Sequence, residues 1–162
     1  GLEARTTVGE VNFNRYWATT GWQAGANNMK EHALGGVDLE IGMPLPYMNW
    51  ATFYAKAFKF YSETPGVKDS IGNVLSFRAE VPVIPGFTIE AGQTQYSSDE
   101  TTNNFVKLEY DLIQAFKKEK TPLFTNYAYK VASMSDQRLK KVRRENKIYK
   151  QMKSSTVTVK GF

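Results

Sequence analysis

A strict alternation of apolar and polar side chains between Val74 and Leu112 constrains this chain more than any other feature. Residues 75–83 carry apolar side chains at every odd position, and residues 106–112 carry them at every even position. Neighbouring side chains of a strand point to opposite faces, so both segments predict strands with one apolar face and one charged face. Strands of a transmembrane barrel have this pattern, with apolar residues toward lipid and polar residues toward the lumen. A soluble sheet whose apolar face is covered by a partner would have it as well.

The same alternation extends toward the N-terminus. It predicts three further strands, at residues 7–17, 34–43 and 50–61. Within the last of them, the apolar residues keep one parity as far as Ala57, and Phe58 and Phe60 take the other. We expect a β-bulge near Ala57, because an inserted residue would return all of these side chains to one face.

The connections between the predicted strands are of two kinds. Short turns that contain proline alternate with longer polar loops: the turns at 44–49 and 84–86, and the loops at 18–33, 62–73 and 97–104. Alternate connections of an up-and-down meander lie at the same end of the sheet, and outer-membrane barrels have short turns at one end and long loops at the other. The predicted fold class is therefore all-β, an antiparallel up-and-down meander that forms all or part of a transmembrane β-barrel, followed by a short C-terminal helix and an extended linker.

Composition agrees with a barrel and excludes a membrane protein built from helices. Mean hydropathy is −0.46, and no apolar run approaches the roughly 20 residues that a membrane-spanning helix needs. Aromatic residues make up 14% of the chain, which suits the aromatic girdles of barrel proteins. Cysteine is absent, which excludes disulfides and thiolate metal sites. An outer-membrane protein requires a signal peptide, and none is recognisable here, so we expect a cleaved leader or a longer parent chain.

Two parts of the chain are expected to differ in structure. Residues 1–113 contain the predicted barrel strands, and residues 114–162 are predicted to form a periplasmic or pore segment with a basic helix and an extended tail. The helix is expected at Ser133–Tyr149, with Ser135 or Asp136 as its N-cap.

Most of the excess positive charge lies in residues 138–153. A solvated amphipathic helix would account for this tract, and so would an anionic partner such as nucleic acid or lipid. Nucleic acid is disfavoured as a partner, because no aromatic residues interleave with the basic ones to form a stacking platform for bases.

No arrangement of residues indicates an enzyme or a cofactor site. His32 is the only histidine, and one histidine beside one carboxylate does not make a metal site. Carboxylates on neighbouring strands could approach as an acid–base pair, but we favour a charged lumen in which Lys and Arg side chains pair with them. The polar residues predicted to face this lumen are Glu10, Asp38, Glu40, Lys56, Arg78, Glu80, Glu90, Lys107, Glu109 and Asp111.

Three separate segments carry more specific motifs. They are HALGGVDLEIG at 32–42 followed by Pro44-Leu45-Pro46, VPVIPGFTIEAG at 81–92, and Arg138-Leu139 followed by VRRENKI at 142–148. In order and spacing, they resemble segments of the inverse autotransporter translocator, of the intimin/invasin type. The likeness covers roughly residues 30–152.

This resemblance implies a twelve-stranded translocator barrel in the Gram-negative outer membrane. Its C-terminal tract would lie in the pore and lead outward to an exported adhesive passenger, and the strand that ends near Ile113 would be the last of the barrel. The implied partners are outer-membrane lipid and the barrel-assembly machinery. The residues that match the family's pore and linker tract are Arg138, Val142, Arg143, Arg144, Asn146 and Ile148.

Two other interpretations remain open at the level of sequence. The alternation predicts six to eight strands, fewer than the family's twelve, so the chain could be a structural subunit of an envelope complex that exports nothing. Its edge strands, 7–17 and 105–113, would then pair with neighbouring subunits. A soluble module that binds through its basic tract is the third interpretation.

Overall fold

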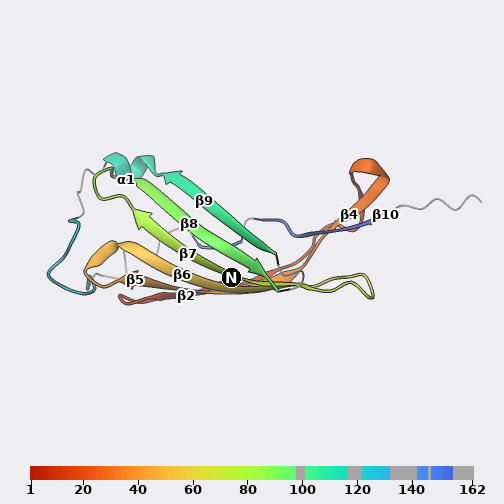
Figure 1. Cartoon of the computed structure of the whole chain (residues 1–162), viewed down its shortest axis with the longest axis horizontal. Coiled ribbons are helices and arrows are strands. Elements are labelled where there is room, and N and C mark those ends of the chain that lie inside the picture. The colour runs from red at the N-terminus through yellow and green to blue at the C-terminus, as the bar shows by residue number, and fades with distance from the viewer. Residues whose placement is uncertain (98–100, 117–121, 132–141, 146, 155–162) are drawn as a thin grey trace, which may run out of the picture.

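The fold is dominated by one antiparallel sheet of seven strands (Figure 1). The computed structural model describes residues 1–97, 101–116, 122–131, 142–145 and 147–154. Each strand of the sheet pairs with the strand that follows it within this sheet, which confirms the predicted antiparallel meander. In sheet order the strands are β1 (Leu2–Arg5), β2 (Glu10–Tyr16), β5 (Gly36–Leu45), β6 (Met48–Phe60), β7 (Ser70–Glu80), β8 (Phe87–Tyr96) and β9 (Thr102–Tyr110).

The sheet is curved and open. In Figure 1, β2, β5 and β6 form the floor of a trough and β7, β8 and β9 rise along one side of it. Within the described residues, the edge strands β1 and β9 pair with β2 and β8 alone, so the sheet does not close into a barrel.

A second, three-stranded sheet lies beyond one end of the trough. It consists of β3 (Gln23–Ala24), β4 (Met29–Ala33) and β10 (Lys150–Ser154), with β4 in the centre. A 3-10 turn, η1 (Ala26–Asn28), joins β3 to β4. The sequence predicted a loop with a possible helical turn in this region. The sequence therefore did not predict the β3–β4 hairpin. Its strands are too short to show a clear alternation, and β4 pairs with β10, which is distant in sequence.

The connections are asymmetric, as the sequence predicted. Three short turns, at 6–9, 46–47 and 81–86, join strands at one end of the trough. The connections at 17–35, 61–69 and 97–101 join strands at the other end, where the three-stranded sheet projects. The first two are longer than any of the turns, whereas 97–101 is about as short as 81–86. We refer to these ends as the turn end and the loop end.

Burial in the large sheet is the reverse of that in a water-soluble sheet. Asp38 and Glu40 of β5 are 2% and 4% exposed, whereas Leu39 and Ile41 between them are 46% and 47% exposed. The same inversion holds in β7 and β8, where Ser76, Thr88 and Glu90 on the concave face are buried. In β9, Lys107 and Glu109 also face the concave side, but residues of both faces are exposed. The described residues place neither a helix nor a second sheet over the convex face.

The predicted bulge in β6 is wrong. Register continues without interruption through Ala57 on both sides of β6, and the register shift in this region lies between Pro44 and Leu45 instead. Phe58 and Phe60 therefore point to the concave face, where they form an aromatic cluster with Tyr149. The alternating apolar residues of β6 thus lie on the convex face as far as Ala57 and on the concave face from Phe58 onward. Burial against Tyr149, which is distant in sequence, stabilises Phe58 and Phe60 there.

The predicted helix at Ser133–Tyr149 is wrong where the structure describes it. Residues 142–145, 148 and 149 have no regular secondary structure, residue 147 lies in a bend, and β10 follows directly. The rest of the predicted helix, with Arg138, lies outside the described residues, as does Asn146. The described helix is the short α1 (Leu112–Phe116), which follows β9.

Residues 122–131 are irregular and contact the turn between β5 and β6. The indole Nε1 of Trp50 donates a hydrogen bond to the carbonyl oxygen of Leu123 at 2.9 Å. Among the described residues, no helix has the length and apolarity needed to cross a membrane.

Candidate functional site

The C-terminal residues 142–145 and 147–154, which we call the strap, run along the trough and out at its loop end (Figure 1). Their side chains alternate in burial. Tyr149 and Gln151 are buried, whereas Ile148 and Met152 are exposed. Arg143 and Glu145 follow the buried parity. The strap is therefore an extended segment that presents every second side chain to the concave face of the sheet.

Arg143 is the main polar anchor of the strap. Its Nε lies 2.6 Å from Oε1 of Glu40 on β5, and its NH2 lies 3.0 Å from Oε1 of Glu90 on β8. Both carboxylates are almost fully buried. An arginine fork suits this geometry, because its planar N–H donors can serve two acceptors at once. The strap thus bridges two strands that are separated by β6 and β7 in the sheet.

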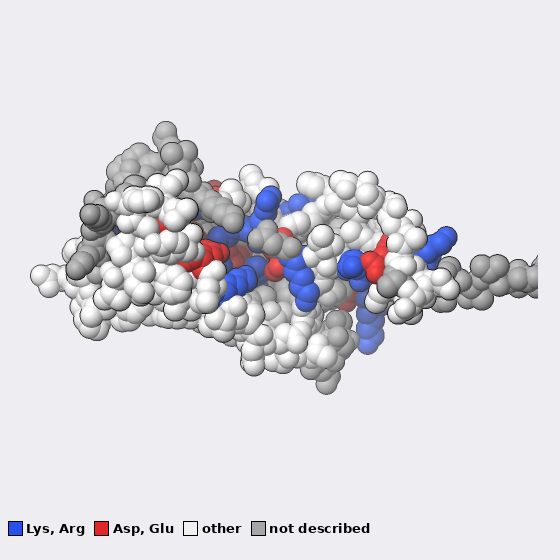
Figure 2. All heavy atoms as spheres, turned by 90° about the horizontal axis from the view of Figure 1, so that it is seen from above, with Lys and Arg blue, Asp and Glu red and all other residues white. Residues whose placement is uncertain are grey.

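Two cations of the sheet complete the charge balance around Arg143. Nζ of Lys56 lies 3.6 Å from Glu40, and NH1 of Arg78 lies 3.6 Å from Glu90. Strand register produces both pairs, because Lys56 is directly opposite Glu40, and Arg78 is directly opposite Glu90. Figure 2 shows acidic and basic side chains gathered along the middle of the face seen from above, between uncharged margins. Buried carboxylates require such partners, since an unpaired buried charge is costly.

The guanidinium of Arg143 also stacks on the ring of Tyr54, at 3.7 Å from the ring centroid. Tyr54 on β6 is directly opposite Gly42 on β5, and a Cβ atom at Gly42 would collide with the tyrosine ring. The absence of a side chain at Gly42 therefore lets the ring lie against the neighbouring strand, where it forms the floor beneath Arg143.

A second set of contacts holds the strap backbone. Nδ2 of Asn14 donates hydrogen bonds to the carbonyl oxygen of Arg143 at 3.1 Å and to Oδ1 of Asp38 at 2.9 Å. The amide of Glu145 donates to the hydroxyl of Tyr16 at 2.8 Å, and that hydroxyl donates to Asp38 at 2.6 Å. Side chains of β2, which are held by Asp38 of β5, thus satisfy backbone groups of the strap that have no ladder partner in the trough.

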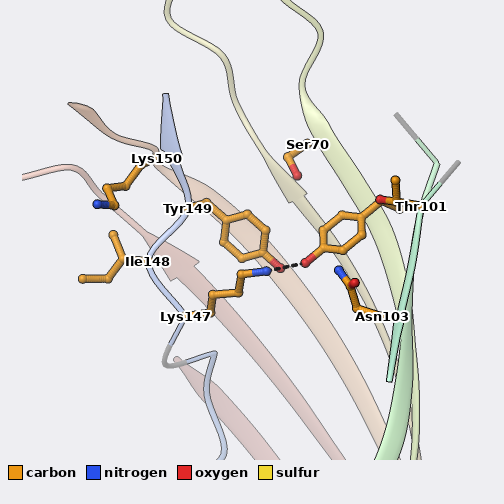
Figure 3. A pocket seen from close by; sticks show the side chains of 8 residues that line it. Ser70, Thr101, Asn103, Lys147, Ile148, Tyr149 and Lys150 are labelled. Carbon is orange, nitrogen blue, oxygen red and sulfur yellow. Dashed lines mark hydrogen bonds between the residues drawn. The ribbon is translucent and has the colours of Figure 1, made fainter. Parts of the chain in front are cut away.

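An aromatic contact fixes the strap nearer the loop end. The ring of Tyr149 stacks on that of Phe60, with centroids 4.0 Å apart and an interplanar angle of 17°. Nζ of Lys147 donates a hydrogen bond to the hydroxyl of Tyr96 at 2.6 Å. Tyr96, Lys147 and Tyr149 line an open cavity of about 320 Å³. Figure 3 shows the side chains of Lys147 and Tyr149 at this cavity. Its other lining residues include Ser70, Thr101 and Asn103.

The structure places most of the predicted lumen residues on the concave face, but in different roles. Arg143 is surrounded by Glu40, Lys56, Arg78 and Glu90. Asp38 accepts hydrogen bonds from the two side chains that hold the strap backbone, Asn14 and Tyr16. Glu109 accepts a hydrogen bond from Arg78, Lys107 lies over the ring of Phe105, and Glu10 pairs with Arg5. Glu80 is exposed near the turn end. Asp111 lies past the end of β9, where its carboxylate accepts a hydrogen bond from the amide of Ile113 at 2.9 Å.

The predicted pore tract divides between two faces of the strap. Arg143 contacts the sheet, whereas Val142, Arg144 and Ile148 are exposed. Sequence reasoning missed the uncharged contacts, which come from Asn14, Tyr16, Tyr54, Phe58, Phe60, Tyr149 and Gln151. The sequence of residues 142–151 shows no alternation of apolar and polar side chains that would have signalled these contacts, and its basic composition favoured a helix. In the described part of the chain, no group of three or more acidic or histidine side chains is arranged to hold a metal ion.

Comparison with protein families gives one relevant result. The family profile of the inverse autotransporter β-domain matches residues 1–146, which is most of the chain. Neither comparison with curated proteins nor comparison with solved structures gave a match. The matched region includes all seven strands of the large sheet together with Arg143, the main anchor of the strap. This chain belongs to the inverse autotransporter β-domain family.

Proposed function

We propose that this chain forms part of the wall of an outer-membrane translocator, which anchors a passenger C-terminal to the strap and exports it. The family implies a location in the Gram-negative outer membrane. The finer proposal is that the convex face contacts lipid, that the strap occupies the pore, and that the exported part is an adhesin-type domain of the intimin/invasin kind.

The convex face supports contact with lipid. Phe77 and Leu75 on β7 are 39% and 49% exposed, and Val106 and Leu108 on β9 are 68% and 65% exposed. An apolar surface that continues over several strands marks an interaction site, because burying each such side chain yields about 2 kcal/mol. In the outer membrane the hydrocarbon core would provide that burial, and the barrel-assembly machinery would deliver the sheet to it.

The margin of this apolar surface supports a tilted membrane sheet. Near the loop end, the convex side of β2 carries Arg15, that of β6 carries Lys59, and that of β8 carries Gln93 and Gln95. At β8 the polar margin reaches Gln93, which is paired with Leu75. Gln93 lies two rows of the same face nearer the turn end than Arg15 and Lys59 do. Strands that tilt by about 40° in a membrane give such a stepped margin.

The single observation that carries the proposal is the position of Arg143 between Glu40 and Glu90. The concave face buries two carboxylates, and the strap supplies the cation that both of them bind. Because the strap runs along the trough, the part of the chain that follows the strap begins at the loop end. This is the arrangement that export through a pore, followed by anchoring, requires.

The open edges support an additional requirement. Seven strands are fewer than the eight of the smallest membrane barrels. We propose that further strands pair with β1 and β9 to close the wall, and that a longer parent chain provides them. The second candidate function, a structural subunit of an envelope complex that exports nothing, would use the same two edges to pair with other subunits.

Protease access on intact cells tests the proposal. An epitope tag is placed after Phe162 in the full-length protein, which is produced in a Gram-negative host. Export predicts that external protease removes the tag from intact cells, while a matched tag in the β5–β6 turn after Pro46 stays protected. A C-terminal tag that is cut only after the outer membrane has been opened would overturn export and favour the structural subunit.

A further inference from the structure

Beyond the trough, the strap enters a second binding site, which is separate from the large sheet. This site is the three-stranded sheet at the loop end, where five residues of β10 pair with β4 in antiparallel register. The sheet shares no strand with the seven-stranded one, and in Figure 1 it projects past the end of the trough.

Contacts from β4 and from the 61–69 loop reinforce the pairing of β10. Lys150 forms an ion pair with Glu31 on β4 at 2.8 Å. The side-chain amide of the buried Gln151 donates to the hydroxyl of Ser62 at 3.0 Å and accepts from the amide of Glu63 at 3.2 Å. Both of the latter partners belong to the 61–69 loop, so β10 is held by a strand on one side and by a loop at its buried face.

An aromatic residue completes the site. Nζ of Lys153 lies 4.0 Å from the centroid of the Trp22 ring, and the same ring lies 5.4 Å from that of His32. His32 on β4 is buried and is directly opposite Gln151. Its Nδ1 lies 3.4 Å from the carboxylate of Glu63. The hairpin and the 61–69 loop thus contact each other beneath β10.

We infer that the β3–β4 hairpin and the 61–69 loop form a docking site for extended polypeptide that leaves the trough. Its ligand in this structure is the segment 150–154, which it binds by β-augmentation, with backbone pairing for affinity and pockets for alternate side chains. The site fixes the residue at which the exported chain stops. This inference rests on the proposed function, because it assumes that the loop end faces outward.

The ladder geometry provides an experiment with a matched control. The amide of Leu34 donates to the carbonyl of Tyr149, so pairs alternate along β10 and the Glu31–Met152 pair is of the non-hydrogen-bonded kind. Cα atoms in such pairs lie about 4.5 Å apart, which permits a disulfide. The chain has no cysteine of its own. The E31C/M152C variant is therefore expected to form a disulfide, and E31C/K153C, whose side chains point to opposite faces, is not.

The cross-link is measured on intact cells that carry the full-length protein with the tag after Phe162. We expect the tag to be exposed, E31C/M152C to be protected from a membrane-impermeant maleimide until it is reduced, and E31C/K153C to be labelled throughout. An exposed tag with equal labelling of both variants would overturn the docking site and leave export standing. A protected tag would overturn export and the docking site together.

A second measurement uses proline, which removes one backbone N–H. In the alternating ladder the amide of Lys153 points to β4, and that of Met152 points to the other edge of β10. Hydrogen exchange of residues 148–154 in lipid vesicles is expected to accelerate at least about fivefold in K153P and less in M152P. Equal exchange in both variants and the unmodified protein would contradict docking by backbone pairing.

Discussion

The two faces of the seven-stranded sheet are built from the same strands but follow opposite rules. On the concave face, Glu40 and Glu90 are buried and depend on the strap for their shared cation. On the convex face, Leu75 and Phe77 are exposed and have no described protein partner layer. The comparison teaches that each face is incomplete for a different reason: one requires a specific segment of the chain, and the other requires an apolar environment. The predictions below change one face at a time.

Removing the cation from the concave face should have the largest effect. Arg143→Ala leaves two buried carboxylates without their shared partner, so we expect a loss of about 3–5 kcal/mol in the free energy of unfolding. Arg143→Lys should recover only part of it, because an ammonium group lacks the planar fork. Unfolding by urea in lipid vesicles measures the change. Arg144→Ala, at an exposed position of the strap, is the control, and an equal loss there would contradict the site.

Placing a charge on the convex face should have the next largest effect. Phe77→Arg puts a cation in the middle of the apolar surface, where a membrane strand loses about 2–4 kcal/mol. Gln93→Arg, near the polar margin of the same face, should cost about 0–1 kcal/mol. Folding into lipid vesicles, followed by titration with denaturant, distinguishes them. Similar costs at both positions would mean that no hydrocarbon contacts Phe77.

Removal of the stacked ring tests the strap near the loop end. Tyr149→Ala should cost about 2 kcal/mol, since a buried aromatic contact with Phe60 is lost. Ile148→Ala changes an exposed neighbour and should cost little. Hydrogen exchange of residues 147–154 reports the local effect. If Ile148→Ala accelerates exchange as much as Tyr149→Ala, the parity assigned to the strap is wrong.

The smallest effect concerns an ion pair outside the trough. A hydrogen bond from the backbone amide of Ser62, followed by one from Lys59, lowers the pKa of the half-buried Asp69 carboxylate. A lowered pKa in the folded state means that the stabilisation is present above the unfolded pKa and is lost as pH falls through the folded one. The protection of the amides in the 61–69 loop, that is, their exchange rate relative to the intrinsic rate at the same pH, should therefore fall on acidification. Asp69→Asn should abolish this pH dependence of protection, and a variant with an unchanged pH profile would contradict it.

Sequence predicted the large sheet well because its signal is local. Alternation in residues 75–83 and 106–112 depends only on which face each side chain takes, so it gave the strands, their faces and the two kinds of connection. The family resemblance, drawn from three short motifs, is confirmed by the match to residues 1–146. The division of the chain at residue 113 stays a prediction.

Sequence failed where a distant segment decides the conformation. Phe58 and Phe60 change face because Tyr149 packs against them, roughly ninety residues later in the chain. Arg143 and Glu145 belong to a tract whose composition favours a helix, yet the sheet holds their backbone in an extended form through Asn14 and Tyr16. Tertiary contacts override local propensity in both cases.

Gly42 has a consequence that reaches beyond its own strand. A methyl group there would lift the phenol ring of Tyr54 away from β5, and with it the surface on which the guanidinium of Arg143 rests. Such a substitution would change neither charge nor hydrogen-bonding capacity. It would nevertheless shift the guanidinium of Arg143, so that its contacts with Glu40 and with Glu90 could not both keep their present distances. The residue at position 42 thus affects how strongly the sheet binds the strap, although glycine has no side-chain functional group.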